Sequence, residues 1–135
     1  MKLPRMILSL MLLTFLVISC STSEAPEETD LAALVQETHW LRQPPAAEAE
    51  IFFSFCPNTD LIVTRREDLN GVIVDTHSQY RYEVNTSRNT LLIYWTDEIV
   101  EYSWSLSGDV LRLEGVSLDR EVELKKNSVA LTVCD

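Results

Sequence analysis

The fold is decided by VEYSWSLSGDVLRLE, residues 100–114, because apolar residues recur there at every second position. In an extended strand, every second side chain points to the same face. One face of the first half carries only apolar side chains, at Val100, Tyr102, Trp104 and Leu106. The turn residues Ser107, Gly108 and Asp109 then lead into a returning strand at 110–114. This stretch therefore predicts an antiparallel hairpin with one buried face.

Short alternating segments separated by turn residues continue on both sides of this hairpin. We expect further strands at residues 51–56, 61–66, 72–75, 80–84, 91–95, 119–124 and 128–133. The Asn70-Gly71 pair is a strong signal for a tight turn, and Lys125-Lys126-Asn127 reads as another turn. The pattern predicts an all-β domain of about eight to ten strands, closed into an up-and-down barrel without exposed edges. An open sandwich is the alternative.

One short helix is expected before the strands. Asp30 precedes the apolar positions Leu31, Leu34 and Val35, which suits a helix of two turns at most, with Thr29 or Asp30 as its N-cap. Residues 38–42 then turn extended before Pro44-Pro45, a pair that fits neither a helix interior nor a central strand.

The first twenty residues, MKLPRMILSLMLLTFLVISC, predict export. Lys2 and Arg5 precede an apolar run over residues 6–18, which as a helix spans about 20 Å, short of the roughly 30 Å hydrocarbon core. The run therefore reads as the apolar region of a signal peptide rather than as a membrane anchor.

The leader ends in Val17-Ile18-Ser19-Cys20, which resembles the bacterial lipobox. That resemblance implies cleavage before Cys20, which becomes residue one, and attachment of a diacylglycerol to its thiol through a thioether, so that membrane lipid is a partner of the protein. Several acyl chains on one residue give stable anchoring. An ordinary secretory signal cleaved nearby is the alternative.

These features divide the chain into three parts. Residues 1–19 are the expected lipoprotein signal peptide, 20–29 the lipidated cysteine with a polar, acidic tether, and 30–135 the β domain. The expected location is the bacterial cell envelope. Residue 21 is Ser21 rather than the aspartate that retains some lipoproteins at the inner membrane. This favours the outer membrane as the location, where the organism has one.

The charge of the chain excludes one class of function. The formal net charge is −10, and it becomes −12 once the leader, with Lys2 and Arg5 and no acidic residue, is removed. Such a surface repels phosphate backbones, so nucleic acid is not an expected partner. Solubility alone also explains the acidity, and we expect a monomer.

With Cys20 lipidated, Cys56 and Cys134 remain as an even pair in an oxidising compartment. We expect them to form a disulfide that ties an early strand to the last one and thereby helps to close the barrel. Free buried thiols are the alternative, and neither cysteine has neighbours in the sequence that would activate it for catalysis.

The sequence offers no catalytic or metal-binding residues. His39 and His77 are not at ligand spacing from Cys, Asp or one another. Asp75, His77 and Ser78 are too close along one strand to relay a proton, because adjacent side chains point to opposite faces. We expect a non-enzymatic protein without a cofactor.

A set of aromatic residues is the candidate binding site for a small apolar ligand. Its members lie in the expected strands and could line a cavity inside the barrel: Phe53, Phe55, Tyr80, Tyr82, Trp95, Tyr102 and Trp104. A filled core is the alternative, because eight strands enclose little more than packed side chains.

Several of these residues carry a family resemblance. Trp40, the phenylalanines at 53 and 55, and the late hairpin YSWSLSGDVLRL at 102–113 resemble the lipocalin-like lipoprotein domains of bacteria. The resemblance implies a calycin-like barrel and no particular ligand. Phe55-Cys56 with Cys134 also resembles small lysozyme inhibitors of the periplasm and membrane.

Two functions follow as expectations. The first is an envelope lipoprotein whose barrel binds a small apolar ligand or a protein partner. The alternative is an inhibitor of an envelope-active enzyme such as lysozyme, in which an exposed loop around residues 70–79 enters the cleft of a cationic partner.

Replacing the expected acylation site tests the assignment of the leader. The Cys20→Ser protein should incorporate no labelled palmitate in a bacterial host and should leave the detergent phase, because no thiol remains to carry a lipid. Cys134→Ser is the matched control and should label normally. Equal labelling of the Cys20→Ser protein would contradict the lipobox assignment.

Overall fold

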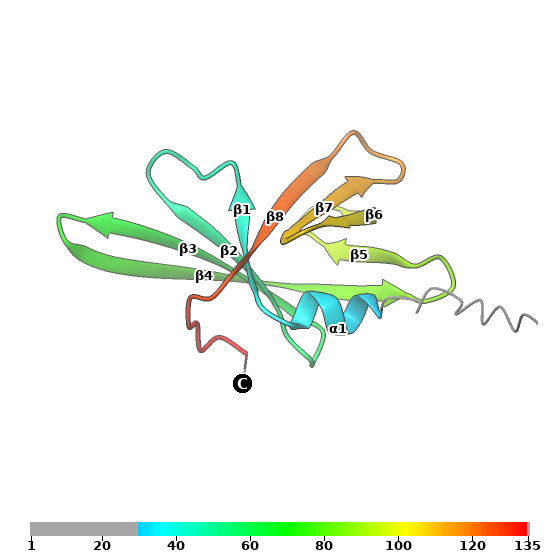
Figure 1. Cartoon of the computed structure of the whole chain (residues 1–135), viewed down its shortest axis with the longest axis horizontal. Helices are drawn as coiled ribbons and strands as arrows, with labels where there is room; N and C mark the ends of the chain where they lie inside the picture. The colour runs from blue at the N-terminus through cyan, green and yellow to red at the C-terminus, as the bar shows by residue number, and fades with distance from the viewer. Residues whose placement is uncertain (1–29, 135) are drawn as a thin grey trace, which may run out of the picture.

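The computed structural model describes residues 30–134, which form one short helix and eight antiparallel strands (Figure 1). The predicted signal peptide, the lipidated Cys20 and the tether lie outside these described residues. In chain order the elements are α1 (Leu31–Gln36), β1 (His39–Gln43), β2 (Glu50–Phe55), β3 (Asp60–Leu69), β4 (Val72–Asn85), β5 (Thr90–Tyr94), β6 (Ile99–Ser107), β7 (Val110–Gly115) and β8 (Glu121–Asn127). The predicted all-β antiparallel fold with a short N-terminal helix is confirmed.

Each strand pairs with the strand that follows it in sequence, and β8 returns to pair with β1. The β1–β8 ladder runs from His39 opposite Asn127 to Gln43 opposite Glu123. The strand order therefore closes on itself, so that the shorter strands have a neighbour on both sides. Closure satisfies backbone groups that would otherwise form an exposed edge.

Helix α1 begins where the sequence predicted it. The Asp30 carboxylate accepts hydrogen bonds from the backbone N–H groups of Ala32 (3.1 Å) and Ala33 (3.3 Å), which confirms Asp30 as the N-cap. Its apolar face, formed by Leu31, Leu34 and Val35, is buried against the barrel core. The helix is anchored further because the indole N–H of Trp40 donates a hydrogen bond to the backbone carbonyl of Val35 (2.9 Å).

The alternation predicted for residues 100–114 holds over the part of the hairpin that covers the core. Val100 and Tyr102 on β6 are buried, as are Leu111 and Leu113 on β7. The predicted inward face does not continue to Leu106, which is exposed, and Trp104 is only half-buried. The end of this hairpin extends past the packed interior, so its apolar residues meet solvent.

The structure corrects the prediction of separate strands at 72–75 and 80–84. They form the single strand β4, which pairs with β3 without a break from Leu69 opposite Val72 to Asp60 opposite Arg81. Asn70 (φ 57°) and Gly71 (φ 87°) adopt the left-handed conformations of the predicted tight turn. Residues 76–79 are polar but contain no Gly, Pro, Asn or Asp, and they continue the ladder. The loop expected at 70–79 is therefore a turn followed by strand.

The C-terminal prediction was also wrong in part. Lys125, Lys126 and Asn127, expected to form a turn, are the end of β8, and residues 128–134 form no strand. The edge of β8 that such a strand would need is already occupied by β1. Residues 128–134, which we call the C-terminal tail, pass instead beside the barrel.

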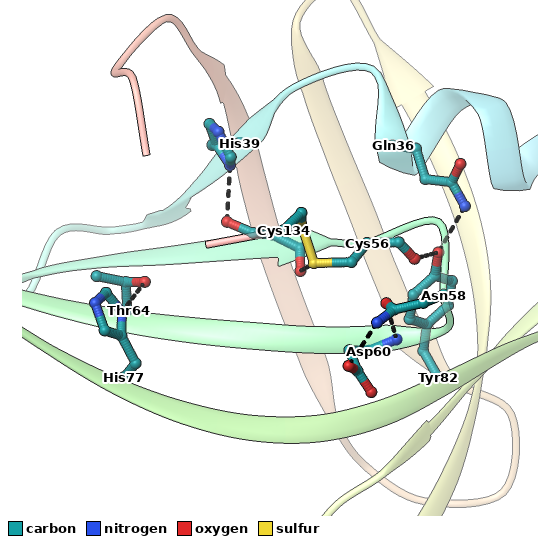
Figure 2. The surroundings of a disulfide bond; sticks show 10 residues. Gln36, His39, Cys56, Asn58, Asp60, Thr64, His77, Tyr82 and Cys134 are labelled. Carbon is teal, nitrogen blue, oxygen red and sulfur yellow. Dashed lines mark hydrogen bonds between the residues drawn. A yellow bond between two sulfur atoms is a disulfide. The ribbon is translucent and has the colours of Figure 1, made fainter. Parts of the chain in front are cut away.

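The predicted disulfide is present, but it joins different elements. Cys56, just after β2, is bonded to Cys134 of the C-terminal tail, with an S–S distance of 1.99 Å and a Cα–Cα distance of 5.3 Å (Figure 2). The bond therefore holds the tail to the turn between β2 and β3, and barrel closure is made by β1 and β8.

Loss of this disulfide should lower stability without opening the barrel. The two cysteines are 78 residues apart, and a loop of that length corresponds to about 4–5 kcal/mol in the chain-entropy model. We expect Cys134→Ser to reduce the free energy of unfolding by up to that amount in denaturant titrations, while the far-ultraviolet circular dichroism keeps its β signature. A loss of that signature would contradict closure by β1 and β8.

Candidate binding surfaces

The aromatic residues proposed as cavity lining form the core of the barrel. Phe53, Phe55, Tyr82 and Tyr102 are at most 4% exposed, and all four belong to one buried cluster. The other three members of the set pack against that cluster and are half-buried: Tyr80, Trp95 and Trp104. The structure thus brings all seven predicted residues to one core, which is packed with their rings.

These rings contact one another edge to face. Phe55 lies 5.1 Å from Tyr82, Tyr80 lies 5.0 Å from Trp95, and Phe53 lies 6.2 Å from Trp95, measured between ring centroids. Such arrangements contribute about 0.5–1.5 kcal/mol per pair beyond the buried area. The contacts mean that side chains occupy the space in which a ligand would lie.

The tyrosine hydroxyls of the core are hydrogen-bonded within the protein. Tyr82 donates to the carbonyl of Cys56 (2.8 Å) and accepts from the Gln36 amide (2.7 Å), as Figure 2 shows. Tyr102 accepts from the indole N–H of Trp95 (3.0 Å). Burial raises the pKa of both tyrosines above the ordinary value, so both remain protonated at neutral pH. They act as structural donors and acceptors.

A surface pocket of about 410 Å³ lies between the start of β1, the end of β2 and the C-terminal tail. Here His39 Nδ1 is 2.8 Å from the Oγ of the buried Ser54. Glu37, which also lines the pocket, is directed to Lys126 (3.3 Å) rather than to the imidazole. The sequence did not predict this pair, because β1 and β2 come together only through the fold.

The second histidine lies on the same outer face of the sheet, but at a different place, on β4. His77 Nδ1 is 2.9 Å from the Oγ1 of the buried Thr64, its cross-strand partner on β3. The structure does not bring His39 and His77 into one site, since each has its own hydroxyl partner. Within residues 30–134, no group of three or more His, Cys, Asp or Glu side chains is arranged to hold a metal ion.

Four exposed apolar side chains lie together at the far end of the β3–β4 hairpin, which runs out beyond the rest of the barrel (Figure 1). Other exposed apolar side chains lie on β6 and in the β7–β8 loop, at Ile99, Leu106, Val116 and Leu118. Val72 is 61% exposed, Ile73 57% and Leu69 54%, and Val74 is also exposed. All of residues 72–79 on β4 are exposed. We call residues 65–77, the outer part of the hairpin, in which β4 has no strand on the β5 side among the residues described, the β3–β4 ribbon.

A charged pair braces this ribbon across its two strands. The Arg66 guanidinium donates two hydrogen bonds, both 2.8 Å, to the Asp75 carboxylate, and it also lies over the ring of Phe52 (5.5 Å). The hydrogen bonds from Arg66 lower the pKa of Asp75 below its ordinary value. Arg65 is paired with Glu67 on the opposite face of the ribbon (2.8 Å). Both arginines are therefore already neutralised.

The described part of the chain contains no helix that is both long and apolar enough to cross a membrane. No protein-family model, curated protein or solved structure matches the chain. The class of protein that the geometry defines is thus an eight-stranded antiparallel β barrel with a filled core and an extended apolar ribbon.

The ribbon should loosen only in acid. Because the folded pKa of Asp75 is lowered, its contribution to stability is complete above the unfolded value of about 3.9 and is lost as the pH falls through the lower folded value. The protection factors of the β3 amides, which compare the intrinsic with the observed exchange rate, should therefore fall at acid pH, and Asp75→Asn should show the lower protection already at neutral pH. Asp97→Asn, which makes the same charge change in the β5–β6 loop, should leave exchange unaltered. Unchanged exchange in Asp75→Asn would contradict the bracing role.

Proposed function

We propose that the chain is a lipid-anchored envelope protein whose lipocalin-like barrel binds a protein partner through its outer surface. The lipobox at Val17–Cys20 supports the anchor and the bacterial envelope as location. The single closed, antiparallel sheet supports the lipocalin-like assignment.

The observation that carries the proposal is the contrast between the interior and the ribbon. The interior aromatics pack against one another, with Tyr82 and Tyr102 hydrogen-bonded inside the protein. The ribbon instead presents Val72, Ile73 and Leu69 to solvent. Contiguous exposed apolar side chains in a soluble domain mark surfaces that bind other molecules. Binding therefore belongs to the outside of this barrel.

The charge of the chain defines the class of partner. The formal net charge, −10 for the full chain and −12 without the leader, produces a negative field that accelerates association with cationic molecules and slows association with anionic ones. A positively charged envelope protein is the partner that suits this surface best.

An inhibitor of an envelope-active enzyme such as lysozyme is the second candidate. The observation that favours it is the shape of the ribbon, a narrow two-stranded projection beyond the barrel (Figure 1) that a cleft could accommodate. A carrier of a small apolar ligand is the third, and it would require the packed aromatic rings to move apart.

Native mass spectrometry of the purified protein separates the carrier from the partner-binding module. We expect a monomer without bound ligand, since ring contacts such as Phe55–Tyr82 fill the core. Phe53→Ala, which opens space in that core, is the matched variant that should gain binding of a small apolar probe. A small molecule that co-purifies with the unaltered protein would overturn the filled-barrel proposal.

The hypothesis that the protein inhibits lysozyme is tested by adding the protein to a lysozyme assay on bacterial cell walls. Inhibition that persists in Phe53→Ala and is lost when Val72 and Ile73 are replaced by serine would support it. Full lysozyme activity at saturating protein would remove this candidate and leave other cationic partners.

A further inference from the structure

We propose that the outer edge of β4, residues 72–79, binds an extended segment of a cationic partner as an added β-strand. This inference rests on the proposed function and specifies the surface and the mode of binding. Strand addition supplies affinity through backbone hydrogen bonds and specificity through alternate side chains.

The edge is open because β5 is much shorter than β4. On one side, β3 pairs with β4 from Val72 to Arg81. On the other side, β5 pairs only with the stretch from Arg81 to Asn85. Within the part of the chain that the structure describes, residues 72–80 therefore have no strand on the β5 side. Closure of the barrel by β1 and β8 leaves this edge untouched.

The hydrogen-bonding pattern between β3 and β4 determines which backbone groups of β4 point to its open edge. The N–H of Tyr82 donates to the carbonyl of Thr59 on the β3 side (3.0 Å). Since the β3–β4 register continues without a bulge, every second residue from Tyr82 back to Val72 also directs its backbone groups toward β3. The residues between them direct their N–H and C=O groups to the open edge. These residues are Ile73, Asp75, His77 and Gln79. Within residues 30–134, the backbone groups of these four residues make no hydrogen bond to a turn or loop.

Most of the usual protections of an open edge are missing from this one, although Thr132 and Val133 of the C-terminal tail line a pocket together with His77 and Gln79 at one end of it. Natural edge strands are blunted by charged side chains, especially lysine, by proline, by a bulge or by a covering segment. The sequence of residues 72–79, VIVDTHSQ, contains no lysine or proline, and its register has no bulge. All eight residues are exposed. A weakly protected edge rich in β-branched residues is suited to strand addition rather than to isolation in solvent.

Charge complementarity selects the occupant. Carboxylates of Glu48, Glu50 and Asp68 surround the base and tip of the ribbon, in addition to Glu67 and Asp75. Arg65 is paired with Glu67, and Arg66 is paired with Asp75. The carboxylates of Glu48, Glu50 and Asp68 therefore remain as uncompensated negative charge. A second copy of this chain brings the same negative charge to the edge and is disfavoured. In a segment that alternates apolar and basic side chains, the apolar side chains can pack against Val72 and Val74 on one face, and the basic side chains can pair with the carboxylates around them.

The probe for this surface is a short synthetic peptide in which valine and lysine alternate. It should bind the purified protein in fluorescence anisotropy, and salt should weaken the binding. A peptide with glutamate in place of lysine should bind at least about tenfold more weakly because its charges are repelled. The decisive comparison is a peptide with N-methyl groups on the backbone edge that faces β4, which cannot donate hydrogen bonds and should also lose about tenfold in affinity.

Two variants of one residue locate the site. His77→Pro removes an outward N–H, whereas His77→Ala keeps it, and both lose the same contact with Thr64. We expect His77→Pro to bind the lysine peptide about tenfold more weakly and His77→Ala to bind it nearly as well as the unaltered protein. Tryptophan fluorescence of each variant checks that the barrel is intact.

The outcomes distinguish this inference from the proposed function. Equal binding of the N-methylated and parent peptides would overturn strand addition and leave a cationic partner bound by charge alone. Failure of the valine–lysine peptide to bind at all would overturn both strand addition and the cationic partner. Dimers of the protein without peptide that dissociate in His77→Pro but persist in His77→Ala would show that a second copy occupies the edge, and would also overturn the cationic occupant.

Discussion

The pairing of β1 with β8 is the constraint on which the rest of the structure depends. With Trp40 turned inward and its indole bonded to Val35, β1 carries α1 against the core and occupies the edge of β8. The C-terminal tail is consequently excluded from the sheet, and Cys134 reaches Cys56 from outside it. The β1–β8 ladder thus accounts for the closure of the sheet, for the packing of α1 against the core and for the position of the disulfide.

Closure also explains why binding is expected on the outer surface. A barrel of eight strands encloses space for packed side chains, and here rings such as Phe55 and Tyr82 fill it. The buried hydroxyls have partners inside the protein, so their hydrogen-bonding capacity is not offered to a ligand. The ribbon is one of the places where apolar side chains remain available to a partner on the outside of the barrel.

The ribbon depends on a mismatch in strand length. β4 is 14 residues long, whereas β5 has five residues and β2 has six, so the two central strands outrun their neighbours. The ribbon keeps its shape through the Arg66–Asp75 pair and the turn at Asn70 and Gly71. Its exposed valines and open backbone edge place apolar contact and hydrogen-bonding groups on one narrow projection in a strongly acidic molecule.

The sequence by itself determined the local features of this protein. Alternation at 100–114, the Asn70-Gly71 turn, the Asp30 cap and the even cysteine pair each reflect a rule that acts within a few residues or on composition. Only the tertiary structure decided which strand lies beside β8, whether residues 76–79 continue a strand, and how far the ribbon extends. It also brought His39 to Ser54, across a sequence gap that no local pattern spans. These features depend on competition among distant segments for the same edges, and that competition is resolved by packing rather than by local preference.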